Sequence, residues 1–394
     1  MEIVRENYLS LLEAGKDKDD VIKVITGMRR AGKSTLLKQY AERLRNNGVP
    51  DDRIFIINFE DIENQHITDK DKLNEWIMDN LPDEGRYYVF LDEIQNVKDW
   101  ELSVSGLQNR PGCDLYITGS NSRMLSSELA THISGRYIEV KILPFSFREY
   151  LQMYPSDDVQ KRFSDYLRFG GLPVVDPDAD IGFTEGLLEG IFNTVMIKDI
   201  LSRVKTDDVS KVTAIAKYLY SNIGNITNID NIAKATGINN VTVSRYINEM
   251  CKAFLFYYAE RYDIVGKKIL KSKGKYYTSD TGMRNALMNE YTNRDISRPL
   301  ENVIYLELIR RGYRVNVGSY KNLEVDFTAT GPKGTEYFQV CQTLISEETY
   351  GREIRPFREI RDNYPKTILT LDRIGLGSDN GVRTVNVIDW LLEE

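Results

Sequence analysis

The first 145 residues alternate between short apolar runs and segments whose apolar residues recur at helical spacing. The apolar runs predict buried strands at 21–25, 54–59, 87–91, 115–117 and 137–143. Behind the first run, the apolar residues with the spacing of an amphipathic helix are Leu36, Leu37, Tyr40, Ala41 and Leu44. Strands that alternate with helices in this way predict a parallel α/β sheet in the first part of the chain.

The pattern changes after the fifth predicted strand. From about 147 to 205 the apolar spacing is helical throughout. Two short helices are then predicted at 229–236 and 241–250, on either side of a turn at Gly237. A helix, a glycine-containing turn and a second helix are typical of a helix-turn-helix unit. A last α/β segment is predicted to start with an amphipathic helix near Leu300.

The turn between the first strand and the first helix carries a phosphate-binding pattern. Residues 27–34 read GMRRAGKS, which satisfies G-x-x-x-x-G-K-[ST] in the strand–loop–helix order that this motif needs. Gly27 and Gly32 permit backbone conformations that let successive N–H groups face one anion. Lys33 would neutralise phosphate oxygens, and the Ser34 hydroxyl would ligate Mg²⁺. The candidate nucleotide-binding residues are Gly27, Arg29, Arg30, Ala31, Gly32, Lys33, Ser34 and Thr35.

Polar residues end the third and fourth strands, where a parallel sheet collects its ligands. Asp92 and Glu93 follow the run YYVFL, so Asp92 is expected to hold Mg²⁺ and Glu93 to polarise the attacking water. Ser120 and Asn121 follow the fourth strand and are candidate sensors of the γ-phosphate; a structural turn is the alternative for them. Arg136 opens the fifth strand, and its planar charged group suits developing phosphoryl charge.

The amino-acid composition argues against several kinds of functional site and partner. The chain of 394 residues has a formal net charge of -7, so no global basic field attracts nucleic acid. Its three cysteines lie far apart and its two histidines are isolated, which argues against a disulfide framework, a zinc site and histidine-based catalysis. The N-terminal residues do not resemble a signal peptide, and no apolar run approaches the length of a membrane span. We expect a cytoplasmic protein without a membrane partner.

The combination of these motifs resembles the AAA+ ATPases. More closely, it resembles a prokaryotic family with an AAA+ module, a winged helix and a C-terminal nuclease-like domain of unknown function. The similar stretches are G-x-R-R-x-G-K-S-T-L-L, L-D-E-I-Q, T-G-S-N-S, S-G-R…P-F-S-F-R-E-Y and F-G-G-L-P. The resemblance implies ATP rather than GTP and an arginine-finger or sensor role for Arg136. For Arg30 it implies contact with nucleotide or a neighbouring subunit, and a solvated position at the rim of the site is the alternative.

The resemblance, read together with the pattern, implies four domains. They are a P-loop AAA+ core at 1–146, a helical lid at 147–206, a winged helix at 207–290 and a degenerate restriction-nuclease-like α/β domain at 291–394. The lid is expected to cover the nucleotide site, as it does in AAA+ proteins.

The densest basic run lies between two β-prone segments that would form the wing, at 254–260 and 275–278. It consists of Lys267, Lys268, Lys271, Lys273 and Lys275. On DNA, the second helix would enter the major groove while these lysines contact phosphates. Arg245 is the only cation of that helix and Glu249 opposes it, so a protein-contact module is the alternative.

The last predicted domain has the order of helices and strands expected of a nuclease fold, but it lacks part of the nuclease metal-binding motif. Asp326, and also Glu301, could hold a divalent metal, and Glu324 lies on the same strand face as Asp326. Where the nuclease motif has E-x-K, however, this sequence has Gln339-Val340-Cys341, and nothing nearby in the sequence supplies the missing lysine. We therefore expect no nuclease activity and favour a docking role for this domain.

The sequence as a whole predicts an ATPase that hydrolyses the β–γ bond with Mg²⁺ and couples this to a macromolecular client. A nucleotide-sensing DNA-binding regulator with little turnover and an ATP-gated nuclease are the alternatives. A protein client and a homo-oligomer both remain open as partners.

Overall fold

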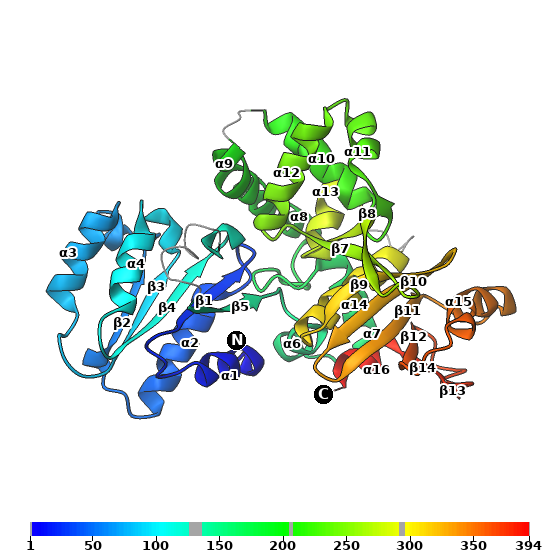
Figure 1. The fold of residues 1–394 in the computed structure, drawn as a ribbon, viewed down its shortest axis with the longest axis horizontal. Coiled ribbons are helices and arrows are strands. Elements are labelled where there is room, and N and C mark those ends of the chain that lie inside the picture. The colour runs from blue at the N-terminus through cyan, green and yellow to red at the C-terminus, as the bar shows by residue number, and fades with distance from the viewer. Residues whose placement is uncertain (1, 126–135, 205–207, 291–295, 394) are drawn as a thin grey trace. The chain divides into compact units, whose positions relative to one another are not determined.

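A computed structural model describes residues 2–125, 136–204, 208–290 and 296–393 of the chain. These residues divide into two compact units, one made of Met1–Ile142 with Lys252–Phe254 and the other of Leu143–Cys251 with Leu255–Glu394. Figure 1 shows the elements of each unit with their labels. The four domains expected from the sequence remain a prediction. Within the described ranges, no helix combines the length and the apolar composition needed to cross a bilayer.

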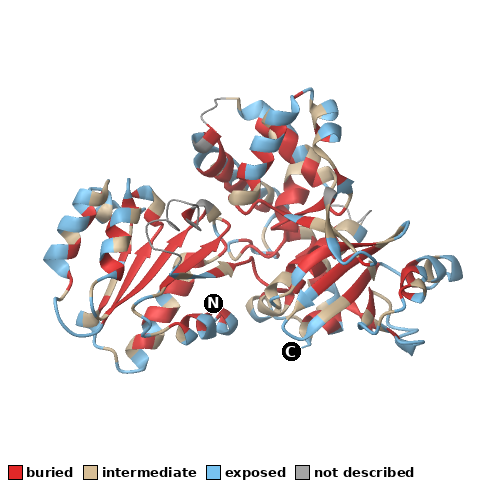
Figure 2. Cartoon of the chain, viewed as in Figure 1, coloured by how far each residue is buried: buried red, intermediate tan, exposed pale blue. Residues whose placement is uncertain are grey.

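The first unit is built on a parallel sheet, as the pattern predicts. Among the described residues this sheet has five strands in the order β2-β3-β4-β1-β5. The strands are β1 (Ile22–Gly27), β2 (Ile54–Asn58), β3 (Tyr87–Asp92), β4 (Cys113–Gly119) and β5 (Tyr137–Ile142). The central strands β1, β3 and β4 are buried along their whole length (Figure 2). Their carboxyl ends meet at one edge, because all neighbouring pairs are parallel.

Helices cover both faces of this sheet. They are α1 (Glu6–Ala14), α2 (Lys33–Asn46), α3 (Lys70–Asn80) and α4 (Trp100–Gln108). On one face, Tyr40 of α2 packs against the rings of Phe90 and Tyr116, with ring centroids 6.3 and 5.2 Å away. The residues before and after these on the strands point to the opposite face, where Val89 and Ile117 share a core with α3 and α4. The period-two alternation of a strand thus supplies both layers.

The second unit begins with helices, which confirms the helical pattern predicted there for the described residues 147–204. These are α6 (Phe147–Met153), α7 (Val159–Phe169), α8 (Ile181–Thr194), the π-helix η5 (Val195–Leu201) and α9 (Ser202–Val204). Further along the chain lie α10 (Val209–Ser221), α11 (Ile229–Thr236), α12 (Asn240–Lys252) and α13 (Thr281–Met288). Polar side chains cap the N-termini of several of these helices. Ser146 and Glu149 form a capping box on α6, and the Asn228 side chain caps α11. Gly237 ends α11 in the left-handed conformation, which glycine adopts without strain.

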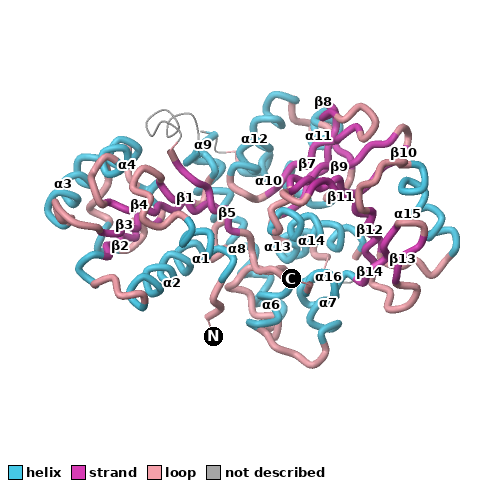
Figure 3. The backbone as a smooth tube through the Cα atoms, turned by 60° about the horizontal axis from the view of Figure 1, so that its bottom comes forward, coloured by secondary structure: helices cyan, strands magenta, loops and turns pink. Residues whose placement is uncertain are grey.

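The rest of the second unit is organised by a mixed sheet. In the described part of the chain it has nine strands in the order β13-β14-β12-β11-β10-β9-β7-β8-β6 (Figure 3). The strands are β6 (Ile226–Thr227), β7 (Phe256–Asp263), β8 (Lys268–Thr278), β9 (Arg314–Tyr320), β10 (Leu323–Gly331), β11 (Gly334–Cys341), β12 (Lys366–Thr370), β13 (Gly377–Asp379) and β14 (Val382–Asn386). The helices α14 (Ser297–Arg310), α15 (Glu347–Glu359) and α16 (Val387–Leu392) accompany it.

This sheet runs through the domain boundary expected near residue 290. Strand β7 pairs with β9 in parallel, so the strands expected to form a wing belong to the same sheet as the C-terminal strands. The reason is shared apolar packing: Tyr277 of β8 stacks on Tyr305 of α14 at 4.1 Å between centroids. Ile264, at the tip of the β7–β8 hairpin, lies in one core cluster with Val325 of β10.

Candidate functional site

The phosphate-loop residues take the backbone path that their motif predicts. Gly27 ends β1 with a φ of 150°, and a Cβ added there would lie 2.3 Å from the carbonyl oxygen of Ile142. Gly32 is left-handed, with a φ of 99°, and directly precedes α2. Arg30 is left-handed as well, which is uncommon outside glycine. Arg5, from the segment before α1, donates from Nη1 to the carbonyl of Ala31 at 3.1 Å and so supports the loop.

Lys33 is buried and turned toward its own loop. Its Nζ lies 3.3 Å from the carbonyl oxygen of Gly27 and 3.4 Å from that of Met28. The same ammonium lies 3.3 Å from Oε1 of Glu93 at the end of β3. The residues that the sequence assigns to phosphate and to water therefore meet at the carboxyl edge of the sheet.

Asp92 is held by neighbours on both sides. Thr118 of β4 donates its hydroxyl to Oδ1 of Asp92 at 2.5 Å and accepts the backbone N–H of Glu93 at 2.9 Å. Burial raises the pKa of Asp92, and hydrogen bonds from the hydroxyls of Ser34 and Thr118 oppose that rise. A hydroxyl and a carboxylate side by side are a donor set that fits a hard cation such as Mg²⁺.

Glu93 adopts a left-handed backbone conformation, with a φ of 54°, directly before the 3-10 turn η3 (Ile94–Asn96). Its Oε1 faces Lys33, and its Oε2 accepts a hydrogen bond from Nε2 of Gln95. Burial alone would raise the pKa of Glu93, but the Lys33 ammonium and the Gln95 amide outweigh it and lower that pKa. The carboxylate therefore stays charged although it is buried.

The other candidates lie around this edge. Ser120 and Asn121 directly follow β4 and are buried. Arg29 is partly buried and pairs with Glu60 at 3.0 Å, whereas Arg30 is exposed. Thr35 lies in the first turn of α2. The pattern thus brings together every candidate except Arg136.

Arg136 lies at the other edge of the sheet. It directly precedes β5, and its carbonyl accepts the N–H of Ile22 at the amino end of β1. Strand β5 runs parallel to β1 and aligns Ile142 with Gly27. At about 3.3 Å per residue, the length of β5 puts Arg136 roughly 20 Å from the phosphate loop of its own chain. The neighbouring Ser134 and Gly135 lie outside the described residues.

A second group of charges lies in the C-terminal sheet, where sequence reasoning missed it. Lys275 of β8 is 3% exposed. Its Nζ lies 2.9 Å from Glu301 on α14, 2.9 Å from Glu324 and 3.7 Å from Asp326, both on β10. Tyr277 also donates to Glu301, at 2.7 Å. We call Lys275, Glu301, Glu324 and Asp326 the buried charge cluster.

This arrangement corrects the expected role of Lys275. The sequence placed it in the DNA-contacting lysine run, but its ammonium is committed to carboxylates inside the fold. The same geometry supplies a lysine beside Asp326, which we had not expected. The spacing of 51 positions between Lys275 and Asp326 hides the contact from any local motif. Of the remaining run, Lys267, Lys268 and Lys273 are exposed, and the Lys271 side chain lies outside the described structure.

The residues that replace E-x-K on β11 serve local structure. Nε2 of Gln339 donates to Glu353 of α15 at 2.8 Å, and its Oε1 accepts the N–H of Asp326 at 3.3 Å. Val340 donates its N–H to Asp326 at 2.9 Å. Cys341 is buried, and burial raises the pKa of its thiol to about 12. In the described ranges, no group of three or more His, Cys, Asp or Glu side chains has a geometry that could hold a metal ion.

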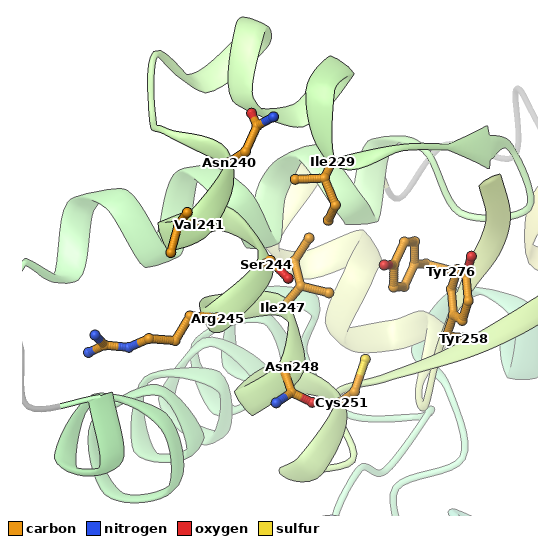
Figure 4. Close-up of a pocket in the computed structure, with 10 residues that line it drawn as sticks. All are labelled: Ile229, Asn240, Val241, Ser244, Arg245, Ile247, Asn248, Cys251, Tyr258 and Tyr276. Carbon is orange, nitrogen blue, oxygen red and sulfur yellow. The ribbon is translucent and has the colours of Figure 1, made fainter. Parts of the chain in front are cut away.

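A pocket of about 860 Å³ lies along α12 (Figure 4). One stripe of that helix borders it, together with Ile229 of α11 and a pair of tyrosines from the β7–β8 hairpin. The rings of these tyrosines, Tyr258 and Tyr276, lie 4.8 Å apart. Arg245 points away from them, and its Nη2 donates to the carbonyl of Val204.

Comparisons with known proteins agree with the first-unit geometry. A family model described as an AAA domain matches residues 19–151, and a domain of unknown function (DUF8612) matches 160–294. An uncharacterized protein of Haemophilus influenzae is 38% identical over 99% of both chains. The uncharacterized protein MJ1544 of Methanocaldococcus jannaschii is 32% identical over 93% of this chain and 85% of its own.

Among solved structures, Cdc6p from Pyrobaculum aerophilum aligns with 73% of this chain and 95% of its own, at a TM-score of 0.32 and 11% identity. That likeness is too distant to bear on function. The AAA-domain match and the two relatives carry the assignment. The chain belongs to a family of AAA-domain proteins that includes these relatives from Haemophilus influenzae and Methanocaldococcus jannaschii.

Proposed function

We propose that this protein binds ATP with Mg²⁺ and hydrolyses its β–γ bond to drive a change in a macromolecular client. The observation that supports this most is the meeting of Lys33, Asp92 and Glu93 at the carboxyl edge of β1 and β3. Each of these side chains is buried, and charged side chains are rarely buried unless a partner or ligand offsets the charge.

The roles follow from charge and position. The N–H groups of the glycine loop and the amino end of α2 receive the phosphates, and Lys33 moves from Glu93 to the β- and γ-phosphate oxygens. Ser34 and Asp92 would hold Mg²⁺, which neutralises phosphate charge when it is bound. Glu93, freed from Lys33, accepts a proton from the attacking water. Ser120 and Asn121 would sense the γ-phosphate from the end of β4.

The test is turnover together with binding. The parent protein is expected to release phosphate from ATP only with Mg²⁺. Lys33→Ala should lose tight nucleotide binding, because the loop loses its only ammonium against phosphate charge. Lys38→Ala is the matched control, since Lys38 is an exposed lysine of the same helix. Calorimetric titration and phosphate release measure both effects, and equal turnover by parent and Lys33→Ala would contradict the proposed site.

We also propose that Arg136 acts on nucleotide held by a neighbouring copy of the chain. Its place at the amino edge of the sheet, about 20 Å from its own phosphate loop, supports a role between subunits rather than within one. This proposal implies a homo-oligomer in the active state.

DNA contact through α11 and α12 is a second proposal. It is supported by the exposed stripe of α12, made of Asn240, Val241, Ser244, Arg245 and Asn248. Amide and hydroxyl side chains at this spacing can reach base edges. The burial of Lys275 weakens the proposal, because fewer lysines remain for phosphates.

If DNA binds there, we expect weak affinity that falls steeply between 50 and 200 mM salt, in the way counterion release requires. The charge reversal Lys268→Glu should weaken it further, whereas the opposite charge change at an exposed residue of the first unit, Glu63→Lys, should not. Fluorescence anisotropy with a labelled duplex measures this. Absence of binding at low salt would favour a protein-contact module.

A further inference from the structure

In the described structure, Gln95 and Lys33 are the residues that form a hydrogen bond or ion pair with the carboxylate of Glu93. Gln95 lies in the middle of η3, two positions after the glutamate. Its Nε2 donates to Oε2 of Glu93, so the amide and the ammonium of Lys33 hold different oxygens of one carboxylate.

The carbonyl oxygen of the Gln95 side chain has no hydrogen-bond donor among the described residues. This atom, Oε1, is buried. A buried polar atom without a partner costs about 1–3 kcal/mol, so it requires an explanation. This oxygen lies beside Gly119, the last residue of β4, where an added Cβ would come within 2.7 Å of it. The amide therefore occupies the space between Glu93 and the strand end that precedes Ser120.

We propose that Gln95 is a positioning residue that aims Glu93 at the attacking water. The inference rests on the proposed ATPase function. When Lys33 turns to the phosphates, Oε1 of Glu93 loses its partner while Oε2 stays held by Gln95. Oε1 is then the acceptor for one water proton. The water oxygen bonds to the γ-phosphorus, and the bond from that phosphorus to the bridging oxygen breaks with its electron pair going to ADP.

The unpartnered Oε1 of Gln95 gives this water a second acceptor. One hydrogen goes to Glu93 and the other, oriented by Gln95, stays on the oxygen that becomes part of phosphate. A glutamine suits this task because its neutral amide combines a donor for the carboxylate and an acceptor for the water. A second carboxylate could accept from the water, but it could not donate to Glu93 and would repel it.

The experiment compares Gln95→Met, Gln95→Glu and Asn96→Ala in the full chain. Methionine keeps the length of glutamine without its amide. Asn96 is exposed on the same turn and serves as the control. We expect Gln95→Met to lower kcat by about 100–1,000-fold, the scale of losing one preorganised hydrogen bond, while KM for ATP changes by less than about threefold. Asn96→Ala should match the parent.

The split between kcat and KM separates positioning from general stability. In Gln95→Met the kcat should fall while the KM for ATP stays near the parent value, because the amide contacts Glu93 and not the phosphate loop. Gln95→Glu should not restore kcat, because a second carboxylate repels the first. Equal ADP binding by calorimetry shows that each variant is folded.

The outcomes are distinct. A parent protein without ATP hydrolysis overturns the proposed function and this inference with it. An active parent whose Glu93→Gln variant is inactive, but whose Gln95→Met variant keeps the parent kcat, overturns the inference alone. Gln95→Met that loses ADP binding together with activity assigns Gln95 to structure and also overturns it.

Discussion

Replacing Glu93 with glutamine is expected to leave ATP bound and to lower turnover by about 10²–10⁴-fold, the usual contribution of a general base. The amide keeps the size of the side chain, so the phosphate loop and Asp92 stay in place. It cannot accept the water proton, however. It also removes the ion pair with Lys33, so nucleotide binding should be unchanged or tighter. Phosphate release and equilibrium dialysis with ATP measure the two effects.

Glu63→Gln is the control for this substitution, because Glu63 is an exposed acid of the same unit. Full activity in Glu93→Gln would show that another group activates the water.

The Glu93→Gln variant also tests the proposed role of Arg136 between subunits. A mixture of inactive Glu93→Gln and inactive Arg136→Ala chains should recover part of the activity, since some sites then combine an intact Glu93 with an intact Arg136. An active enzyme that is strictly monomeric would contradict the role between subunits.

Replacing Lys275 with methionine is expected to destabilise the second unit by about 3–5 kcal/mol, the cost of breaking a buried ion pair by removal of one partner. Methionine fills a similar volume, so the loss is electrostatic. Without the ammonium, the carboxylates of Glu301 and Glu324 lose the cation that pairs with them in a site with little water. Urea unfolding followed by circular dichroism gives the free energy of unfolding.

The control is Lys268→Met, at an exposed lysine of the same strand, which should change stability by less than about 0.5 kcal/mol. Adding Glu301→Gln and Glu324→Gln to Lys275→Met should recover part of the loss, because the unpaired charges are then gone. A Lys275→Met protein as stable as the parent would show that the buried charge cluster does not hold this sheet together.

The cluster also predicts a pH dependence. Burial and the neighbouring Glu301 raise the pKa of Asp326 from 3.8 to about 8, and Lys275 opposes part of that rise. An acid whose pKa is raised on folding stabilises the folded state most below its unfolded pKa, and that contribution disappears as the pH rises through the folded pKa. The free energy of unfolding should therefore fall between pH 5 and 9 in the parent, and fall less in Asp326→Asn.

The sequence by itself determined the parts of this protein whose contacts are local. The phosphate loop is a contiguous run, so residues 27–34 indicated strand, turn and helix together with the place of Lys33. The alternation of apolar runs and helices likewise predicted a parallel sheet, because a strand and a helix each show their period within about ten residues. Asp92 and Glu93 were found for the same reason, since they end a run that predicts a strand.

Only the tertiary structure decided which distant residues meet. Lys275 appeared to be one of several surface lysines, yet long-range pairing of β8 with its neighbours carries it to carboxylates on α14 and β10. Arg136 was a candidate from its sequence context, but only strand direction showed that it lies at the opposite edge from the phosphate loop of its own chain. Gln95 follows Glu93 by two positions, but its contact depends on a left-handed backbone at Glu93. Such contacts arise from packing between segments, and no local spacing records them.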